Sequence, residues 1–405
     1  MGRPLEGITV LDLSQFLSGP RCAQILSLLG ARVIKVETPA GDTMRLLMRL
    51  MGSERALSTM HQNKEAIVVD WRTPEGARII RELTQRADIF LENFAKGILD
   101  KSGLGYSDLS RENPKLVYVS ITGFGHTGPL AERTAFDIIA QATAGIMWAQ
   151  GNPDRPPGVF FADLVSGAYA AVGAMSALWQ REQTGKGQHV DISMQDVMYF
   201  HNFWALADRA NGPDREKVAS LLGRTLVSFL TSQEHPLPFW NSYHARDGYI
   251  VIVALTDAQW NRFMEIIGRP ELIEDERFNS LVGRVRNADE GVAIVSAWVS
   301  KRTTDEVEKL LNEARIPCGR VKDFNELFAD AHLHERGMFP KATHPVFGSV
   351  DSCGFPIKMS GSELEVVSGC PNLGQHTESV LKELLGYDDA RVAELRKRGV
   401  ILHGE

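Results

Sequence analysis

The first 120 residues alternate between short apolar segments and segments with helical periodicity, and this alternation limits the possible folds more than any other feature. The apolar segments have the length of strands and lie at 9–13, 31–37, 66–71, 87–91 and 115–121. Helical patterns separate them, as from Pro20 to Leu29, where Gly30 follows at the position that commonly ends a helix. Strands connected through helices pair in parallel with right-handed crossovers. The sequence therefore predicts an α/β fold with a doubly wound parallel sheet.

The rest of the chain divides into further segments. Helical patterns also cover 135–149 and 167–183, and Thr73 with Pro74 has the residue types of a helix N-cap and first helical position. Residues 211–237 are loop-like, and beyond them an apolar strand is expected at 249–255 and helices at 257–267, 288–300, 304–314 and 377–385. We expect the N-terminal part of a large domain at 1–200, a linker at 201–224, a smaller α+β domain at 225–325 and a C-terminal segment at 326–405.

Composition excludes several classes of function. A net charge of -7 over 405 residues argues against general binding to nucleic acid or to an anionic membrane. No segment approaches the roughly 20 uninterrupted apolar residues of a membrane helix, and Met1–Glu6 has no features of a secretory signal. The cysteines are far apart, at positions 22, 318, 353 and 370. We therefore expect free thiols, a cytoplasmic location and no metal site.

Two acidic residues are the strongest candidates for chemistry. Asp163 lies in an apolar segment just before the predicted helix at 167–183, where it could be a reactive carboxylate or a helix N-cap. Asp137 could belong to the same site or be a first-turn acid that the helix dipole favours. Lys35, Arg72 and Lys101 follow or end strand segments and could bind an anion or be solvated surface charges. The glycine fingerprints of dinucleotide and P-loop sites are missing.

A set of short motifs occurs in a characteristic order along the whole chain. The motifs are Leu5–Leu13, Ser18–Pro20, Leu29–Glu37, Leu91–Phe94, Asn113–Tyr118, Ile121–Gly125, Ala162–Asp163, Gln183–Met194 and Leu373–Thr377. Together they resemble the class III CoA-transferases of the CaiB/BaiF type, the family of formyl-CoA transferase and carnitine CoA-transferase. The resemblance implies a Rossmann-like large domain built from both chain ends, a smaller domain, and two identical subunits that interlock.

The resemblance also assigns roles to residues. By position, Asp163 matches the family's nucleophilic aspartate, and Asp137 matches an acidic residue near the reacting centre. Contacts to CoA are implied for Leu17, Ser18, Val69, Arg72, Asn93, Phe94 and Lys101. Acyl-CoA esters and carboxylic acids would be substrates, with succinyl-CoA a plausible donor, and no cofactor would be permanently bound. A carboxylate ionised at pH 7 would attack the acyl-CoA and carry the group as an anhydride and then as an aspartyl-CoA thioester.

The chain departs from the family pattern at several positions. Thr38 stands where some members have a basic side chain, and residues 239–243 replace the glycine-rich lid loop of formyl-CoA transferase, so formyl-CoA and oxalate are poor substrate predictions. Residues 239–243 and the aromatic cluster at 199–204 could line an acyl pocket or belong to the core.

Two other functions remain open. Racemases of the same fold exchange the α-proton of 2-methylacyl-CoA esters and carry a histidine where this chain has Phe136, which cannot transfer a proton. His126 lies in the preceding loop and does not match that position. The other alternative is a CoA-binding subunit of a heteromeric transferase, which the size and activity of the purified chain would distinguish.

Overall fold

The computed structural model describes residues 2–151, 153–210, 217 and 236–402, and the chain forms two compact units. The first unit contains residues 1–144, 156–201 and 331–405, and the second contains 145–155 and 202–330. Most of the expected linker at 201–224, the first residues of the expected small domain and most of the loop-like segment at 211–237 lie outside the described residues.

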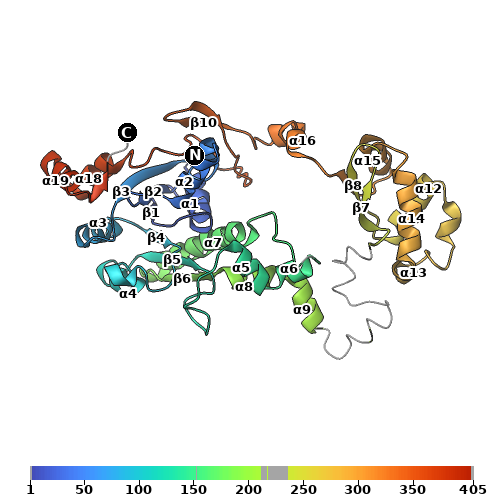
Figure 1. The fold of residues 1–405 in the computed structure, drawn as a ribbon, viewed down its shortest axis with the longest axis horizontal. Coiled ribbons are helices and arrows are strands. Elements are labelled where there is room, and N and C mark those ends of the chain that lie inside the picture. The colour runs from blue at the N-terminus through green and yellow to red at the C-terminus, as the bar shows by residue number, and fades with distance from the viewer. Residues whose placement is uncertain (1, 152, 211–216, 218–235, 403–405) are drawn as a thin grey trace. The chain divides into compact units, whose positions relative to one another are not determined.

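A mainly parallel sheet is the centre of the first unit (Figure 1). Its strands are β1 (Thr9–Asp12), β2 (Arg32–Glu37), β3 (Lys64–Val69), β4 (Ile89–Glu92), β5 (Val117–Thr122), β6 (His189–Ser193) and β12 (Ile401–Leu402), in the order β12-β3-β2-β1-β4-β5-β6. Only β12 is antiparallel, to β3. The strand order reverses between β1 and β4, and ligands of such sheets bind at the carboxyl ends of the strands beside this point.

Helices and a hairpin complete the first unit. The helices are α1 (Ser18–Leu28), α2 (Thr43–Leu50), η1 (Glu54–Thr59), α3 (Pro74–Thr84), η2 (Asp100–Ser102), α4 (Tyr106–Glu112), α5 (Asp137–Thr143), α7 (Phe161–Thr184), α8 (Met194–His201), α17 (Ala331–Glu335), α18 (Thr377–Leu385) and α19 (Asp389–Lys397); the hairpin is β10 (Lys341–His344) with β11 (Gly348–Asp351). The main core combines apolar side chains of the sheet with those of α3, α4, α18 and α19. The C-terminal residues therefore share one core with the N-terminal ones.

The C-terminal segment also completes the edge of the sheet beside β3. The amide of Ala66 donates to His376 Nδ1 at 3.0 Å, and the amide of Val68 donates to Thr377 Oγ1 at 3.0 Å. Further along, the amide of Asp70 donates to the carbonyl of Val400 at 2.8 Å. Without these partners the edge strand would present unpaired donors.

The second unit has its own core around a three-stranded antiparallel sheet. Its elements are α6 (Ile146–Ala149), α9 (Phe203–Ala210), β7 (Trp240–His244), β8 (Tyr249–Val253), α12 (Asp257–Ile266), η4 (Pro270–Ile273), α13 (Leu281–Arg286), α14 (Ala288–Val299), α15 (Thr304–Glu313), β9 (Cys318–Arg320) and α16 (Phe324–Phe328). Phe239 and Tyr243 are buried in this core, as ordinary packing predicts. Trp240, by contrast, is exposed.

Two helix predictions were wrong in informative ways. The segment 135–149 forms two helices, α5 and α6, because Gly145 between them adopts a left-handed conformation with φ of 77°. The helix expected at 167–183 begins at Phe161, six residues earlier, and its N-cap residue, Phe160, makes no side-chain capping hydrogen bond. The prediction at Thr73 and Pro74 is confirmed, since Thr73 Oγ1 accepts a hydrogen bond from the amide of Gly76 and Pro74 is the first residue of α3.

Helix α7 is, among the described residues, the one helix that is long and apolar enough to cross a membrane by those criteria alone. Its packing is that of a core helix, because it lies against α1 and contacts β5 and β6. Nearly half of its most apolar 18 residues are buried inside the protein. This burial accounts for part of its apolar composition, while Val172 and Trp179 on the same helix are exposed.

Candidate active site

Asp163 lies in the first turn of α7, and its side chain does not cap that helix. The N-cap residue is Phe160, which offers no side-chain hydrogen bond, so the N-cap interpretation of Asp163 is wrong. A carboxylate in the first turn does gain from the helix dipole. Asp163 therefore needs an explanation beyond helix initiation.

Asp137, the first residue of α5, meets Asp163 directly. Its Oδ1 accepts a hydrogen bond from the amide of Asp163 at 3.0 Å, and its Oδ2 accepts one from Gln141 Nε2 at 2.7 Å. The same Nε2 donates to the carbonyl of Val159 at 3.0 Å. Asp137 is thus both a first-turn acid of α5 and a side chain that satisfies a free amide at the start of α7.

The surroundings of Asp163 disfavour its charge. Burial and, to a smaller extent, the nearby carboxylate of Asp137 raise the pKa of Asp163 to about 7, although the side chain of Ser18 opposes the shift. A carboxyl group whose pKa is raised this far is only partly ionised at pH 7, unlike the ionised carboxylate expected from the sequence. A carboxylate that is poorly solvated when ionised is also a more reactive nucleophile.

The loop after β1 brings Ser18 to this carboxylate. Asn93, which follows β4, accepts a hydrogen bond from the amide of Gln15 at 2.7 Å and donates to the carbonyl of Gln15 at 2.8 Å. It also donates to Ser18 Oγ at 3.0 Å. Phe16, between them, has a φ of 60°, which is unusual for a bulky residue. The loop is thus clamped across the β1–β4 boundary, where this type of sheet binds its ligands.

Two glycines allow close packing around the start of α1, one against α7 and one against the loop after β1. A Cβ added at Gly167, one helical turn after Asp163, would lie 2.4 Å from the carbonyl oxygen of Ser18. A Cβ added at Gly19 would lie 2.0 Å from the Cβ of Ser14. Any larger residue at either position would push the Ser18 turn away from Asp163.

Comparisons with known proteins establish the family of the chain. The model of CoA-transferase family III matches residues 5–377. The chain belongs to CoA-transferase family III. It is 34% identical over 407 residues to succinyl-CoA–D-citramalate CoA-transferase of Chloroflexus aurantiacus, with 98% of each chain covered. It is 34% identical to human succinyl-CoA:glutarate CoA-transferase, with 98% of this chain and 90% of the relative covered.

Solved structures show the same fold. A CaiB/BaiF family protein from Brucella suis is 33% identical and superimposes with a TM-score of 0.78, over 95% of this chain and all of that one. By sequence comparison, a formyl-CoA:oxalate CoA-transferase of Streptomyces avermitilis is also 33% identical, with 99% of this chain and all of the relative covered. The protein is a class III CoA-transferase, an enzyme class that uses CoA thioesters as substrates.

The residues predicted to contact CoA have different surroundings in this transferase. Leu17 and Ser18 begin α1, and Phe94 packs edge-on against Trp71 with ring centroids 5.2 Å apart. Val69 is 0% exposed at the end of β3, whereas Lys101 is exposed. The side chain of Arg72 is 57% exposed and pairs with Asp70 at 2.7 Å. The structure therefore brings together Ser18, Asn93, Asp137 and Asp163, while Arg72 and Lys101 remain separate surface cations.

Lys35 does not bind an anion from solvent, which corrects that interpretation. It is buried in a cluster of three carboxylates and three cations, formed by Asp12, Lys35, Glu37, Asp42, Arg45 and Lys64. Its Nζ donates to the carbonyl of Ser14 and lies 3.5 Å from Asp42 Oδ2. Asp42 Oδ1 in turn accepts from the amide of Phe16 at 3.3 Å. The cluster thus fixes the backbone of the loop after β1 at Ser14 and Phe16.

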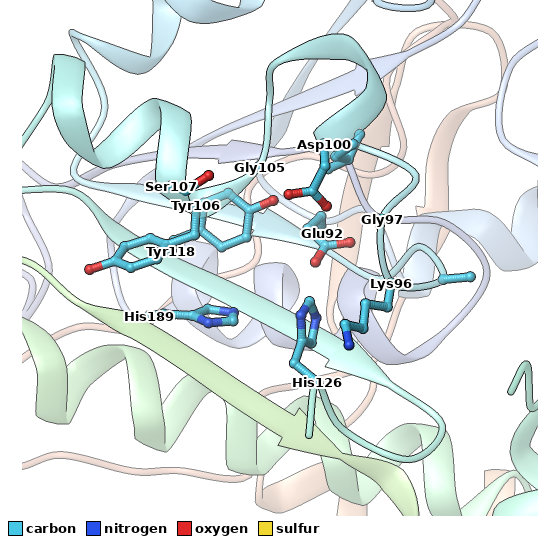
Figure 2. Close-up of a pocket in the computed structure, with 12 residues that line it drawn as sticks. Glu92, Lys96, Gly97, Asp100, Gly105, Tyr106, Ser107, Tyr118, His126 and His189 are labelled. Atoms are coloured by element: carbon cyan, nitrogen blue, oxygen red, sulfur yellow. The ribbon is translucent and has the colours of Figure 1, made fainter. Parts of the chain in front are cut away.

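A separate cavity of about 140 Å³ opens beside the carboxyl end of β4 and the first residues of β5 and β6 (Figure 2). Its wall includes Glu92, Lys96, Asp100, Tyr106, His126 and His189, and none of the predicted catalytic or CoA-binding residues. Burial raises the pKa of Glu92 to about 7, although hydrogen bonds from Ser120 and the amide of Phe94 oppose the shift. Within the described parts of the chain, no group of three or more His, Cys, Asp or Glu residues is arranged to hold a metal.

Sequence reasoning missed several residues that shape the site of the transferase. Gln141 and Gly167 had not been selected, and neither had the buried pair of Asp12 and Lys64. A glycine four residues after Asp163, inside a helical pattern, was an available signal for a close contact. Asp12 offered none, because an acid at the end of a strand can equally face solvent.

Proposed function

We propose that this transferase moves CoA from an acyl-CoA donor to a carboxylic acid through covalent intermediates on Asp163. A carboxylate oxygen of Asp163 attacks the thioester carbonyl and displaces CoA thiolate, which leaves a mixed anhydride. The thiolate then attacks the aspartyl carbonyl, releases the donor acid and forms an aspartyl-CoA thioester. An acceptor carboxylate reverses these two steps and leaves as its CoA ester.

The contact between Asp137 and Asp163 is the observation that carries this proposal. Asp137 fixes the start of α7 and also raises the pKa of Asp163, so the carboxylate is held in place and poorly stabilised as an anion. Each step exchanges one activated acyl group for another, so the reaction needs neither ATP nor a metal. Exclusion of water would protect the anhydride and the thioester from hydrolysis.

Mass spectrometry of trapped enzyme tests the mechanism. The protein is incubated with a panel of acyl-CoA esters without an acceptor acid, and hydroxylamine is then added. We expect a hydroxamate at residue 163, with Asp137 unmodified as an internal control. Absence of a residue-163 adduct with every donor of the panel would contradict the covalent mechanism.

We propose succinyl-CoA as the donor and a dicarboxylic acid as the acceptor, since the relatives named above include succinyl-CoA transferases for D-citramalate and glutarate. Acceptors of increasing chain length, each with one or two carboxyl groups, should be compared at fixed succinyl-CoA. A preference for monocarboxylic acids, or for another donor, would overturn this assignment while leaving the mechanism intact.

For CoA binding we propose contacts from Leu17, Ser18, Val69, Asn93 and Phe94, with the phosphates near Arg72 or Lys101, which are both exposed. Arg72→Ala and Lys101→Ala should each raise KM for the acyl-CoA, by about tenfold where the contact is direct. Arg78→Ala, which removes another exposed arginine on the neighbouring α3, is the matched control. Unchanged KM in both test variants would exclude this placement.

We further propose that two copies of the chain interlock as a homodimer. Large apolar side chains are exposed on α5, α7 and α8, among them Ile139, Val172, Trp179 and Phe200. Monomers rarely leave so many large apolar groups in water. A monodisperse monomer at micromolar concentration would exclude the homodimer, and an inactive chain restored by a second, related chain would support the heteromeric alternative.

The racemase alternative is disfavoured by the residue before Asp137. Phe136 is 65% exposed and packs edge-on against Phe16, with ring centroids 5.6 Å apart. It offers no group that could move a proton. We therefore expect no deuterium uptake at the α-carbon of a 2-methylacyl-CoA in heavy water, and rapid uptake would restore the racemase.

A further inference from the structure

Gln141 is a buried residue to which the proposed mechanism assigns no role, and its side-chain amide has a fixed orientation. It lies in α5, four residues after Asp137, and is 0% exposed. Its Nε2 donates to Asp137 Oδ2 at 2.7 Å and to the carbonyl of Val159 at 3.0 Å. Because a backbone carbonyl can only accept, the atom that faces Val159 is Nε2, and a flipped amide is excluded.

The two hydrogen bonds of Gln141 hold both ends of the segment that leads into the nucleophile. The carbonyl of Val159, where this segment begins, accepts from Gln141 directly. The amide of Asp163, where it ends, donates to Asp137 Oδ1 at 3.0 Å, and Gln141 holds the other oxygen of that carboxylate. The N-cap residue between them, Phe160, makes no side-chain capping hydrogen bond. The start of α7 is therefore held by a pair of side chains from α5.

We propose that Gln141 is a positioning residue that acts through Asp137 to fix the backbone of Asp163 for attack on the acyl-CoA. This inference rests on the proposed role of Asp163 as nucleophile. Since Gln141 is fully buried, it acts without contact to the substrate and without transfer of a proton.

Loss of the Gln141 donor would affect the nucleophile through one intermediate contact. Asp137 is only 7% exposed, so its Oδ2 would be left short of a donor in a poorly solvated place. A carboxylate in this situation rotates towards water or takes up a proton, because a buried charge without its partners is costly. Either change weakens the hold of Asp137 on the amide of Asp163. The rate should then fall, because attack on the thioester requires a close and aligned approach of the two reacting atoms.

The first test compares Gln141→Met with Gln62→Met. Methionine has nearly the length and volume of glutamine but carries no N–H donor. Gln62 is also 0% exposed, and its Nε2 donates to Ser352 Oγ at 2.7 Å and to the carbonyl of Cys353 at 2.6 Å. Both variants therefore lose two buried hydrogen bonds, but only Gln141→Met loses the contact with Asp137.

The measured quantity is the single-turnover rate of adduct formation at Asp163, followed by acid quench and mass spectrometry with the donor that labels the wild type best. The pH is set to about 9, where a carboxyl group with a pKa of about 7 is ionised and a change in protonation cannot imitate a change in position. We expect Gln141→Met to lower the maximal rate by about 10- to 100-fold, with a half-saturating concentration within about threefold of wild type. Gln62→Met should keep the wild-type rate.

Three results of this comparison would overturn the positioning role. They are an unchanged rate in Gln141→Met, an effect confined to its half-saturating concentration, and equal rate losses in Gln141→Met and Gln62→Met. The free energy of unfolding, measured in urea for both variants, shows whether they are comparably destabilised.

The second test exchanges the amide and the carboxylate of the pair. Asp137→Asn can still accept from the amide of Asp163 but turns an N–H group toward Gln141, so two donors meet. Gln141→Glu brings a carboxylate oxygen to Asp137, so two acceptors meet. With both changes in one chain, a donor again faces an acceptor.

We expect each single change to lower the rate of adduct formation and the double variant to be faster than either of them. The recovery is partial, because the carbonyl of Val159 still lacks the donor from residue 141. Losses that add, or that exceed the sum, contradict the proposal, and this comparison decides even if Gln141→Met does not fold. A wild-type enzyme that forms no adduct at Asp163 refutes the proposed function itself, whereas normal adduct formation in Gln141→Met refutes the positioning role alone.

Discussion

Two groups of carboxylates in the same unit have opposite electrostatic surroundings. Asp12 is buried between the ammonium groups of Lys35 and Lys64, and although burial alone would raise its pKa, these cations hold the pKa below the ordinary value. Asp163 has no such cation among the causes of its shift, and its pKa rises to about 7. A paired carboxylate is stable and unreactive, whereas an unpaired one is strained and available for chemistry. The difference marks the first as scaffold and the second as the reacting group.

The largest expected effect is the loss of activity on substitution of Asp163, the carboxylate that lacks a cationic partner. Asp163→Asn keeps the size of the side chain but removes the attacking anion, so turnover should fall by several orders of magnitude while the fold is kept. Steady-state rates and circular dichroism measure the two properties. Near wild-type turnover, once deamidation back to Asp is excluded by mass spectrometry, would falsify the nucleophilic role.

A large effect on stability is expected in the scaffold group. Lys64 donates to Asp12 at 3.3 Å and to the carbonyl of Pro20 at 3.1 Å, and its removal leaves a buried carboxylate short of one partner. Lys64→Met should lower the free energy of unfolding by about 3–5 kcal/mol, measured with urea. Arg49→Met, which breaks the exposed pair with Glu54, should change it by about 0–1 kcal/mol. Equal effects of the two variants would remove the distinction between buried and exposed pairs.

A third effect sharpens the comparison through pH. Only ionised Asp163 attacks, and its pKa is raised to about 7, so adduct formation should increase about tenfold per pH unit below 7 and level off above it. Asp12 stays ionised throughout this range, so its titration does not contribute to the pH dependence of the rate. The measurement is the single-turnover rate as a function of pH. A rate that declines only near pH 4 would show that the environment does not hold the proton on Asp163.

The smallest expected effect is a gain in stability on substitution of Asp163, whereas most substitutions lower stability. The folded protein keeps the Asp163 proton up to about pH 7, whereas the unfolded chain loses it near pH 4. Wild-type stability therefore falls as pH rises through this window. Asp163→Asn should be more stable than wild type at pH 8, on the order of 1–2 kcal/mol because the site is partly solvated, and equal to it near pH 4. A pH-independent difference in urea midpoints would contradict this.

The sequence predicts most elements of the parallel sheet and its helices, but fewer of the contacts around Asp163. Periodicity located the parallel strands, and the Thr73–Pro74 cap was correct because its signal is local. The start of α7 was missed because Phe160 and Phe161 carry no capping signal and tertiary contacts, including the one from Asp137, satisfy its first turn. The burial of Lys35 was also missed, since its partners Asp12 and Asp42 come from two segments outside its own strand. Local chemistry is visible in a sequence, whereas pairing between distant segments is not.

The partners of the β3 edge have a consequence for the newly made chain. The amides of Ala66 and Val68 donate to side chains that lie 310 and 309 residues later in the sequence, those of His376 and Thr377. Strand β12, which pairs with β3, comes later still. While the ribosome is still making the intervening residues, one edge of the sheet has open hydrogen-bonding positions that a neighbouring nascent chain could fill. Truncation before residue 376 should therefore produce aggregates and not a smaller folded protein, and the interval before the edge closes is when a chaperone would be needed most.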